Sequence, residues 1–450
     1  MNKRISMLFT IAAVAVMGAT LFGSTYTTTQ ISGQSFDMNK LDVDVMEKIH
    51  NMGGLELVMP SAYAETDCGA IPKDRKVVEF NITGESAQLP IMGGKTFNAM
   101  TFSGQIPGPT LRVTQGDVVK MTLTIPAGEP TPHGNDMHAS QMSAGNFGAV
   151  MPGTSKTYCY IAEVPGIYKY HCSGVDVAAM DQHVLSGMYG ITIVDPIDGY
   201  KKLMTEGTKV MNGKVVQDRK FLSADALEFQ LQYNQLYLND DGNYDMKKMM
   251  AHSTTQTVVN GKAFSYVPNE AHNELIMGDA KKNIFVAQPW NSADLKQHQS
   301  QLLFVEAGQH TRWFVENQGN EPVFFHIVGE IIDRVVQGNR VQAQGTETWL
   351  IGGSQGAIMD VVFDKPGVYV AVNHDYAAIF SGAATVIVAG DPFGLNEQLG
   401  TNAKSYAELL GNPSSAVPPK GKNSIDHPKL NLNGEYTDKR AAEIAKKLGI

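Results

Sequence analysis

The segment VPGIYKYHC at residues 164–172 ends in a histidine that is directly followed by a cysteine. Its framework returns at residues 365–374 as KPGVYVAVNH, which ends in a histidine and has no cysteine. A second pair matches in the same order, with DVVKMTL at 117–123 and GQHTRWFV at 308–315. Self-similarity of this kind indicates two copies of one structural unit.

Short strands are the elements that the sequence predicts for both copies. Apolar or alternating runs at residues 77–82, 117–125 and 190–194 are separated by glycine and proline turns, and no long amphipathic helix lies between them. This pattern is typical of a β-sandwich or barrel. We therefore predict an all-β chain with one sandwich at residues 70–197 and a second at residues 255–391.

The other segments have less regular patterns. Residues 198–254 are expected to connect the two sandwiches, with a hairpin turn at 240–243, and residues 392–450 are expected to be a C-terminal extension. Residues 1–22 begin with basic side chains and then run apolar, as in a signal peptide or an N-terminal anchor, and residues 23–69 resemble a polar linker. These features predict an exported protein, periplasmic or otherwise extracytoplasmic, and leave the cleavage point open.

The acidic composition limits the possible partners. A net charge of −9 and an isoelectric point near 5.7 argue against binding to nucleic acid. The charge instead suits a protein that docks other small proteins through local patches. Histidines outside the motifs are expected to be surface or satisfied core residues: His50, His252, His272, His298, His310 and His427.

The end of the repeated segment and the residues that follow it contain three side chains of a blue-copper site. Cys172 is followed by His183 and then by Met188. A thiolate, an imidazole and a weak thioether bind copper in trigonal electron-transfer centres. If His171 and Cys172 lie on one strand, their side chains point to opposite faces. One face then holds the electron-transfer copper, and the other face is free to bind a second metal.

The segment PHGNDMH at residues 132–138 supplies further ligands for both metals. His133 and His138 are five residues apart, and this odd offset on an extended strand places them on opposite faces. One histidine can therefore serve each metal. Asp136 shares a face with His138, so a carboxylate is expected beside the second metal.

These motifs resemble those of copper-containing nitrite reductases, which have two cupredoxin domains and act as homotrimers. The resemblance covers residues 76–391. It implies two tandem cupredoxin-like Greek-key domains and two copper ions per chain. The implied ligands of the type 1 copper are His133, Cys172, His183 and Met188, and those of the type 2 copper are His138, His171 and His374. In that family the last histidine comes from a neighbouring subunit, so the type 2 copper lies at an interface.

The same resemblance implies the reaction and the residues that assist it. Nitrite is reduced to nitric oxide by one electron, which a small cupredoxin or a cytochrome c delivers to the type 1 copper. The electron then passes through Cys172 and His171 to the type 2 copper. Asp136 and His326 match the catalytic proton carriers of the family, and Val328 matches an aliphatic residue that crowds the substrate.

The chain departs from the family pattern at several places. Ile331 stands where the family usually has a second histidine, which affects how His326 is held. Residues 267–300 look like an insertion. Alanines at 377 and 378 replace bulkier residues beside the type 2 site, so the shape of the substrate pocket is open.

Two other functions share part of this pattern. A two-domain laccase-like oxidase needs a trinuclear copper cluster built from paired His-x-His motifs, and no such pair stands at His171, His326 or His374. A non-enzymatic blue-copper carrier needs neither a type 2 site nor Asp136. Counting copper per chain separates the three functions.

The two cysteines outside the copper motif leave an open question. In an exported protein, Cys68 and Cys159 can form a disulfide. The alternative is that Cys159 is a buried thiol on a strand.

Overall fold

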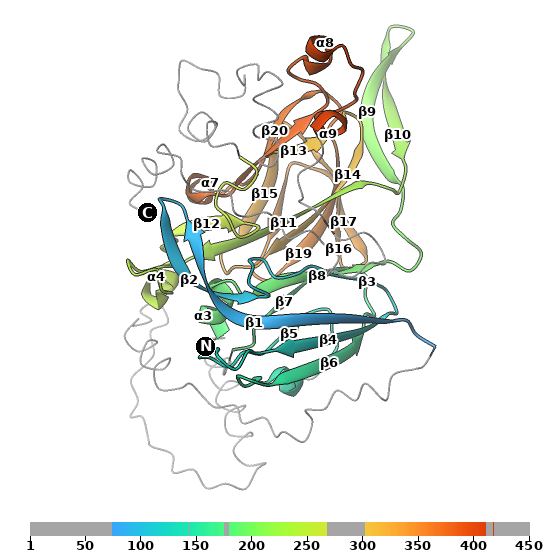
Figure 1. Cartoon of the computed structure of the whole chain (residues 1–450). Coiled ribbons are helices and arrows are strands. Elements are labelled where there is room, and N and C mark those ends of the chain that lie inside the picture. Colours follow the sequence, from blue (N-terminus) through green and yellow to red (C-terminus); the bar gives the residue numbers. More distant parts are fainter. Residues whose placement is uncertain (1–73, 143, 175–179, 268–301, 411–416, 418–450) are drawn as a thin grey trace, which may run out of the picture. The chain divides into compact units, whose positions relative to one another are not determined.

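A computed structural model describes residues 74–142, 144–174, 180–267, 302–410 and 417 (Figure 1). The predicted leader, the whole of the expected linker, all of the expected insertion except residue 267, and most of the C-terminal extension lie outside these residues. The strands are β1 (Val77–Ile91), β2 (Lys95–Phe102), β3 (Leu111–Thr114), β4 (Val118–Thr124), β5 (Asp136–Met137), β6 (Ser155–Ile161), β7 (Gly166–His171), β8 (Tyr189–Asp195), β9 (Leu203–Met211), β10 (Lys214–Leu222), β11 (Leu227–Leu236), β12 (Gln256–Val259), β13 (Leu303–Val305), β14 (His310–Asn317), β15 (Val323–Val328), β16 (Ile332–Gln337), β17 (Arg340–Thr346), β18 (Thr348–Ile351), β19 (Gly356–Val362), β20 (Gly367–Asn373) and β21 (Ala384–Ala389).

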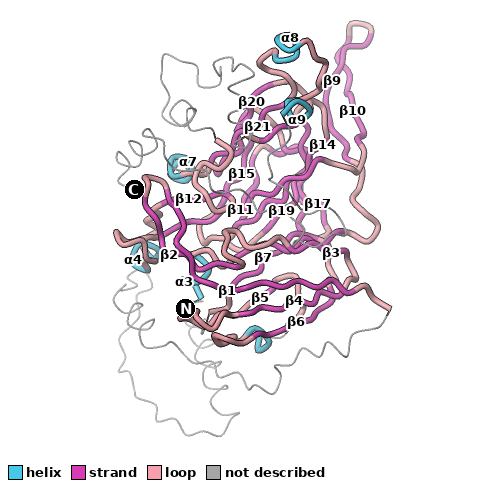
Figure 2. Tube along the Cα trace, viewed as in Figure 1, coloured by secondary structure: helices cyan, strands magenta, loops and turns pink. Residues whose placement is uncertain are grey.

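Within the described residues, helices are few and short, as the sequence predicts for the two sandwiches (Figure 2). They are η3 (Ala144–Phe147), α3 (Met180–Leu185), α4 (Met246–Met250), α7 (Tyr376–Ser381), α8 (Leu395–Leu399) and α9 (Tyr406–Leu410). None of the helices in the described ranges has the length and apolar character needed to span a bilayer.

Strand pairing confirms the predicted repeat. The first sandwich has the sheets β2-β1-β4-β6 and β3-β8-β7-β5, and the second has β12-β11-β14-β19-β16-β17 and β13-β21-β20-β15-β18. β1 lies parallel to β4 as β11 lies parallel to β14, and β3 lies parallel to β8 as β13 lies parallel to β21. The all-β prediction is therefore confirmed, and the four-stranded order of each sheet in the first copy returns in the second, which adds β16, β17 and β18.

The connecting segment 198–254 does more than join the sandwiches. Its strand β11 lies in the six-stranded sheet of the second sandwich, between β12 and β14. Its strands β9 and β10 form a separate two-stranded hairpin. The turn at 240–243 is present, since Gly242 has a φ of 77° and the flanking residues Leu238 and Tyr244 form an antiparallel bridge.

Strand β7 carries side chains to two different environments. Tyr170 and the following Cys172 belong to the apolar core of the first sandwich. Ile167 belongs to a cluster with Phe314 and Ile358 of the second sandwich. Lys169 lies on the same strand face as Ile167 and His171, and its ammonium donates to the Gln318 carbonyl at 2.7 Å and to Ser354 Oγ at 3.1 Å. One face of β7 therefore packs in a domain core, while the other contacts the second sandwich.

Candidate metal centres

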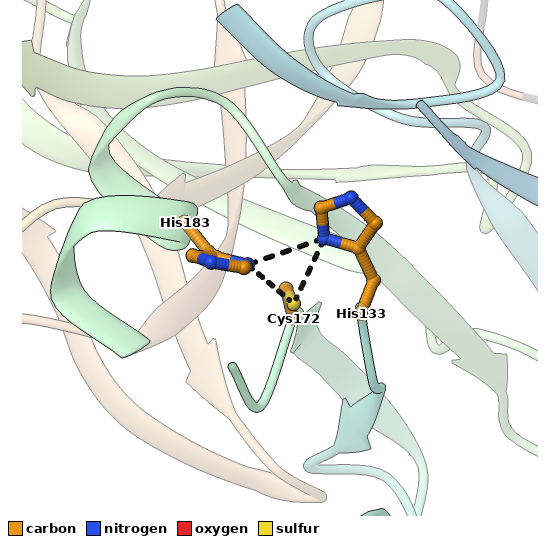
Figure 3. Close-up of side chains that lie close together, drawn as sticks. All are labelled: His133, Cys172 and His183. Atoms are coloured by element: carbon orange, nitrogen blue, oxygen red, sulfur yellow. Dashed lines mark hydrogen bonds between the residues drawn. The ribbon is translucent and has the colours of Figure 1, made fainter. Parts of the chain in front are cut away.

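The first cluster lies where β7 ends. Cys172 follows the strand, His183 lies on α3, and His133 lies in the loop before β5 (Figure 3). The Nδ1 atoms of His133 and His183 are 3.2 Å apart, and Cys172 Sγ lies 3.3 Å from His183 Nδ1 and 3.8 Å from His133 Nδ1. All three side chains are buried. Three of the predicted type 1 ligands are thus brought together from separate parts of the first sandwich.

The spacing of these atoms fits a bound metal ion. Two atoms held at about 2.0–2.3 Å from one ion, at trigonal or tetrahedral angles, lie about 3.3–3.9 Å apart. The observed separations nearly match this range. One sulfur and two imidazole nitrogens form the donor set that favours blue-copper geometry.

Met188 is held next to the same cluster by its backbone. Its amide donates to the His183 carbonyl at 3.1 Å, and its carbonyl accepts from the Cys172 amide at 3.0 Å. Gly84 allows the close approach of β1, because a Cβ there would lie 2.7 Å from Ile125 Cδ1 and 3.3 Å from both Met188 Cε and His133 Cδ2. The Met188 side chain is fully buried, and the methyl group of its thioether and the His133 ring both face Gly84 of β1.

The Cys172 sulfur has two backbone donors. The amides of Gly134 and Gly174 donate to Sγ at 3.4 and 3.3 Å. Burial raises the pKa of the thiol to about 11, although both amides favour the thiolate. A bound cation supplies the positive charge that a buried thiolate needs.

A carboxylate lies behind the first cluster. Glu129 Oε1 is 3.4 Å from His133 Nε2, the ring nitrogen that points away from Cys172 and His183. Ser86 holds this carboxylate, since its amide donates to Oε2 at 2.8 Å and its hydroxyl to Oε1 at 2.6 Å. Burial raises the pKa of the Glu129 carboxyl, but the hydrogen bonds from Ser86 and His133 outweigh burial and lower it overall.

The second cluster contains Asp136, His138 and His171. The Nε2 atoms of His138 and His171 are 3.1 Å apart, and Asp136 Oδ2 is 3.7 Å from His171 Nε2. His171 Nδ1 donates to the Cys172 carbonyl at 2.9 Å, so its Nε2 lone pair faces His138. A second hydrogen bond of this kind orients histidines that bind metals.

Burial dominates the electrostatics of the second cluster. It lowers the pKa of His171 to about 3 and also lowers the pKa of His138, so both imidazoles stay neutral at ordinary pH. Burial raises the pKa of Asp136, and the ammonium of Lys169 and the protonated form of His138 oppose that rise. Neutral imidazoles are the form that binds a metal. This cluster therefore suits a metal ion and an adjacent proton carrier.

His374 and His326 lie together, away from the second cluster of the same chain. Their ring centroids are 5.3 Å apart, and His326 Nδ1 donates to the Glu347 carbonyl at 2.6 Å. His374 is exposed, and Val328 is half-buried two residues beyond His326 on β15. Among the described residues, two groups bring three potential ligands together, and His374 belongs to neither.

Three residues in or near the clusters' surroundings were not predicted from the sequence: Glu129, Lys169 and Glu316. Glu129 stands four residues before His133, and no motif marks it. Lys169 is a lysine inside an otherwise apolar strand, and that position alone gives a signal of a special role. Glu316 of the second sandwich is also fully buried, and neither of its carboxylate oxygens has a hydrogen-bond partner within the described residues.

The other described cysteines and histidines have structural roles. Cys159 is disulfide-bonded and Cys172 is free. Cys68 is the one other cysteine of the chain, although it lies outside the described residues. His310 is a satisfied core residue bonded to Asp360 at 2.8 Å, and His252 is an exposed residue paired with Glu321.

Comparisons with known proteins point to one family. A copper-containing nitrite reductase of Neisseria meningitidis is 28% identical over 65% of this chain and 64% of its own length. Another, of Rhizobium sullae, is 28% identical over 73% of this chain and 80% of its own length. The chain resembles copper-containing nitrite reductases. It spans slightly less than two thirds of the Neisseria relative.

A structural comparison and a family model agree with this resemblance. The copper nitrite reductase structure from Nitrosomonas europaea has a TM-score of 0.54 and 28% identity, and covers 70% of this chain and 95% of that chain. A family model described as multicopper oxidase matches residues 83–198. The fold is therefore that of the nitrite reductases, with two tandem cupredoxin-like sandwiches.

Proposed function

We propose that this protein is an oxidoreductase that reduces nitrite to nitric oxide with one electron, using two copper ions per chain. The observation that carries the proposal is the position of His171 and Cys172. These neighbours belong to different ligand clusters, so a single peptide bond joins a thiolate centre to an imidazole centre. An electron carrier needs the first cluster alone, and the second cluster adds a place for chemistry.

The residues of the first cluster fit a type 1 copper and those of the second fit a type 2 copper. When bound, copper supplies one-electron chemistry at the thiolate centre and a coordination position for a small anion at the imidazole centre. His133, Cys172, His183 and Met188 are the proposed type 1 ligands. The backbone between Cys172 and His171 is the short covalent path between the clusters.

Asp136 is the proposed proton carrier at the second cluster. Reduction of nitrite to nitric oxide consumes one electron and two protons and releases water. The Asp136 carboxyl lies within 4 Å of His171 Nε2, where an anion beside the metal is within its reach. Because burial raises its pKa, Asp136 takes up a proton more readily than a surface carboxyl does. We expect turnover to rise as the pH falls from neutral.

His374 is the proposed third imidazole ligand, donated by a second copy of the chain. Among the described residues of one chain, the second cluster contains two histidines beside Asp136, and a catalytic metal site commonly has three protein ligands. The surface around His374 is apolar and exposed: Phe324 is 39% exposed, Leu350 is 55% exposed and Tyr376 is 68% exposed. Side chains of this kind are enriched at protein interfaces.

This second copy also brings His326 and Val328 to the metal. His326 is held by the Glu347 carbonyl, so the ring is oriented for a second proton transfer although Ile331 replaces the family histidine. Val328 lies on the same strand face and narrows the space beside it. We propose a homotrimer that is exported and receives electrons from a small cupredoxin or a cytochrome c.

Nitric oxide release tests the reaction directly. Purified, copper-loaded protein with an artificial reductant is expected to release nitric oxide from nitrite and to contain about two copper ions per chain. His138→Ala is expected to keep the blue absorption and to lose turnover, whereas Cys172→Ser is expected to lose the absorption. A blue protein with one copper that releases no nitric oxide is an electron carrier instead, and about four coppers per chain indicate a laccase-like oxidase.

A further inference from the structure

The carboxylate behind the first cluster is built into the fold by three hydrogen bonds. Glu129 comes from the loop after β4, and Ser86 comes from β1, 43 residues earlier in the chain. The Glu129 side chain is 5% exposed, and that of His133 is fully buried. The two carboxylate oxygens of Glu129 accept hydrogen bonds from the Ser86 amide and hydroxyl, and Oε1 also lies 3.4 Å from His133 Nε2.

The orientation of the His133 ring decides which atom is the donor in its contact with Glu129. Nδ1 faces Cys172 and His183 (Figure 3). When Nδ1 binds a metal, the ring proton of a neutral imidazole lies on Nε2. Nε2 then donates to Glu129 Oε1. Histidine, metal and carboxylate in this order form an arrangement in which the carboxylate increases the electron donation of the imidazole.

We propose that Glu129 is a positioning residue for the thiolate metal centre: by accepting the Nε2 proton of His133 it fixes the ring and lowers the reduction potential of the copper bound there. This inference rests on the proposed type 1 copper. The carboxylate increases the basicity of one ligand and places negative charge close to the metal, and both effects favour the cupric over the cuprous ion. The amides of Gly134 and Gly174 act in the opposite direction, because they withdraw charge from the thiolate.

The test measures the potential of the blue centre in the copper-loaded full chain, by optical titration of the thiolate absorption. Glu129→Gln keeps the size and an acceptor oxygen but removes the charge. We expect the equilibrium constant for reduction to rise about tenfold, which is about 59 mV for one electron. Ser86→Ala removes the hydroxyl that shares Oε1 with His133 and leaves the carboxylate in place. It is expected to strengthen the bond to His133 and move the potential in the opposite direction, by less.

Glu79→Gln is the matched control. It removes an exposed carboxylate from the same strand as Ser86, where it pairs with Lys120, and is expected to leave the potential unchanged. A shift in Glu129→Gln no larger than that of Glu79→Gln overturns the inference. If Glu129→Gln does not fold, Ser86→Ala decides, and an unchanged or raised potential is then the contrary result.

The two proposals fail in different ways. Wild-type protein that shows no thiolate absorption with copper contradicts the type 1 site itself. Wild-type protein that is blue, combined with an unshifted Glu129→Gln, contradicts the role of Glu129 alone. The electron paramagnetic resonance spectrum of the cupric ion, compared between the wild type and Glu129→Gln, gives a second measurement that does not depend on nitrite turnover.

Discussion

Two inactive variants of this chain are expected to restore activity when they are assembled together. His138→Ala removes a ligand from the first sandwich, and His374→Ala removes one from the second. Each variant alone is expected to lose nitrite turnover and to keep the blue absorption, because neither residue belongs to the cluster of Cys172. If each active site takes its histidines from two subunits, a mixed oligomer contains one site with neither substitution.

The amount of recovered activity follows from the ring. In a trimer, a site is intact only where a chain with His138 precedes a chain with His374 around the ring. Both possible mixed trimers contain a single such junction, so either one is expected to have about one third of the wild-type turnover. A two-fold dimer gives about one half instead. The recovered fraction therefore also reports the size of the ring.

Co-expression with two different affinity tags provides the assay. Sequential purification on both tags isolates mixed oligomers, and their nitric oxide release is compared with that of each variant carrying both tags. Copper content and blue absorption serve as loading controls. Mixed oligomers that are no more active than the single variants refute the reasoning, because His374 then completes the site within its own chain or not at all.

Three further predictions concern proton transfer, pH and packing. Asp136→Asn is expected to lower turnover about 100-fold and to remove its rise toward acidic pH, as measured by steady-state assays from pH 5 to 8. Burial, together with nearby carboxylates, raises the pKa of Asp333 to about 7, so its contribution to stability is full below about pH 4 and is lost as the pH rises through about 7. Asp333→Asn should remove this loss, so that its free energy of unfolding in urea at pH 8 exceeds that of the wild type by on the order of 4 kcal/mol, relative to the difference at pH 4. Buried Arg112 bonds Asp195 at 2.8 Å and Glu228 at 2.6 Å, so Arg112→Met leaves a buried carboxylate unpaired and should cost about 3–5 kcal/mol in the same unfolding assay.

Each of these has a result that contradicts it. An Asp136→Asn enzyme with the wild-type pH profile places proton transfer elsewhere. If the free energies of unfolding of Asp333→Asn and the wild type change equally between pH 4 and 8, the folded state does not raise the pKa of this carboxyl. Arg219 pairs with Glu206 on the exposed hairpin, and Arg219→Met should change stability by less than about 0.5 kcal/mol. An Arg112→Met protein that is no less stable than Arg219→Met shows that the two ion pairs of Arg112 contribute little to stability.

Local spacing was enough to predict much of the first cluster. His171 ends β7 and Cys172 follows it directly, and neighbouring side chains of an extended backbone point to opposite sides. His133 and His138 are also divided between the two clusters, but the expected extended strand through both is wrong: His133 lies in the loop before β5, and β5 covers only Asp136–Met137. The repeated segments at 164–172 and 365–374 likewise predict two sandwiches, because equal sequence patterns form equal strands.

Other features depend on residues that are distant in sequence. β11 was expected in a connecting segment, yet it lies parallel to β14 in the second sandwich, and no local pattern reveals a parallel partner. Glu129 has no motif, and only the approach of Ser86 from β1 aims its carboxylate at His133. The separation of His374 from His138 and His171 is also a matter of how the sandwiches pack.

The order of residues by itself predicted that His171 and the adjacent Cys172 point to opposite sides of the backbone, and thereby that two separate clusters form. That information is carried by the two-residue period of a strand, which acts over a few ångströms along the backbone. Only the tertiary structure decided that Glu129 contacts a ligand of the first cluster and that His374 is exposed at the surface. Such contacts join strands that are far apart in sequence, and they depend on burial and on hydrogen-bond partners that local patterns do not encode.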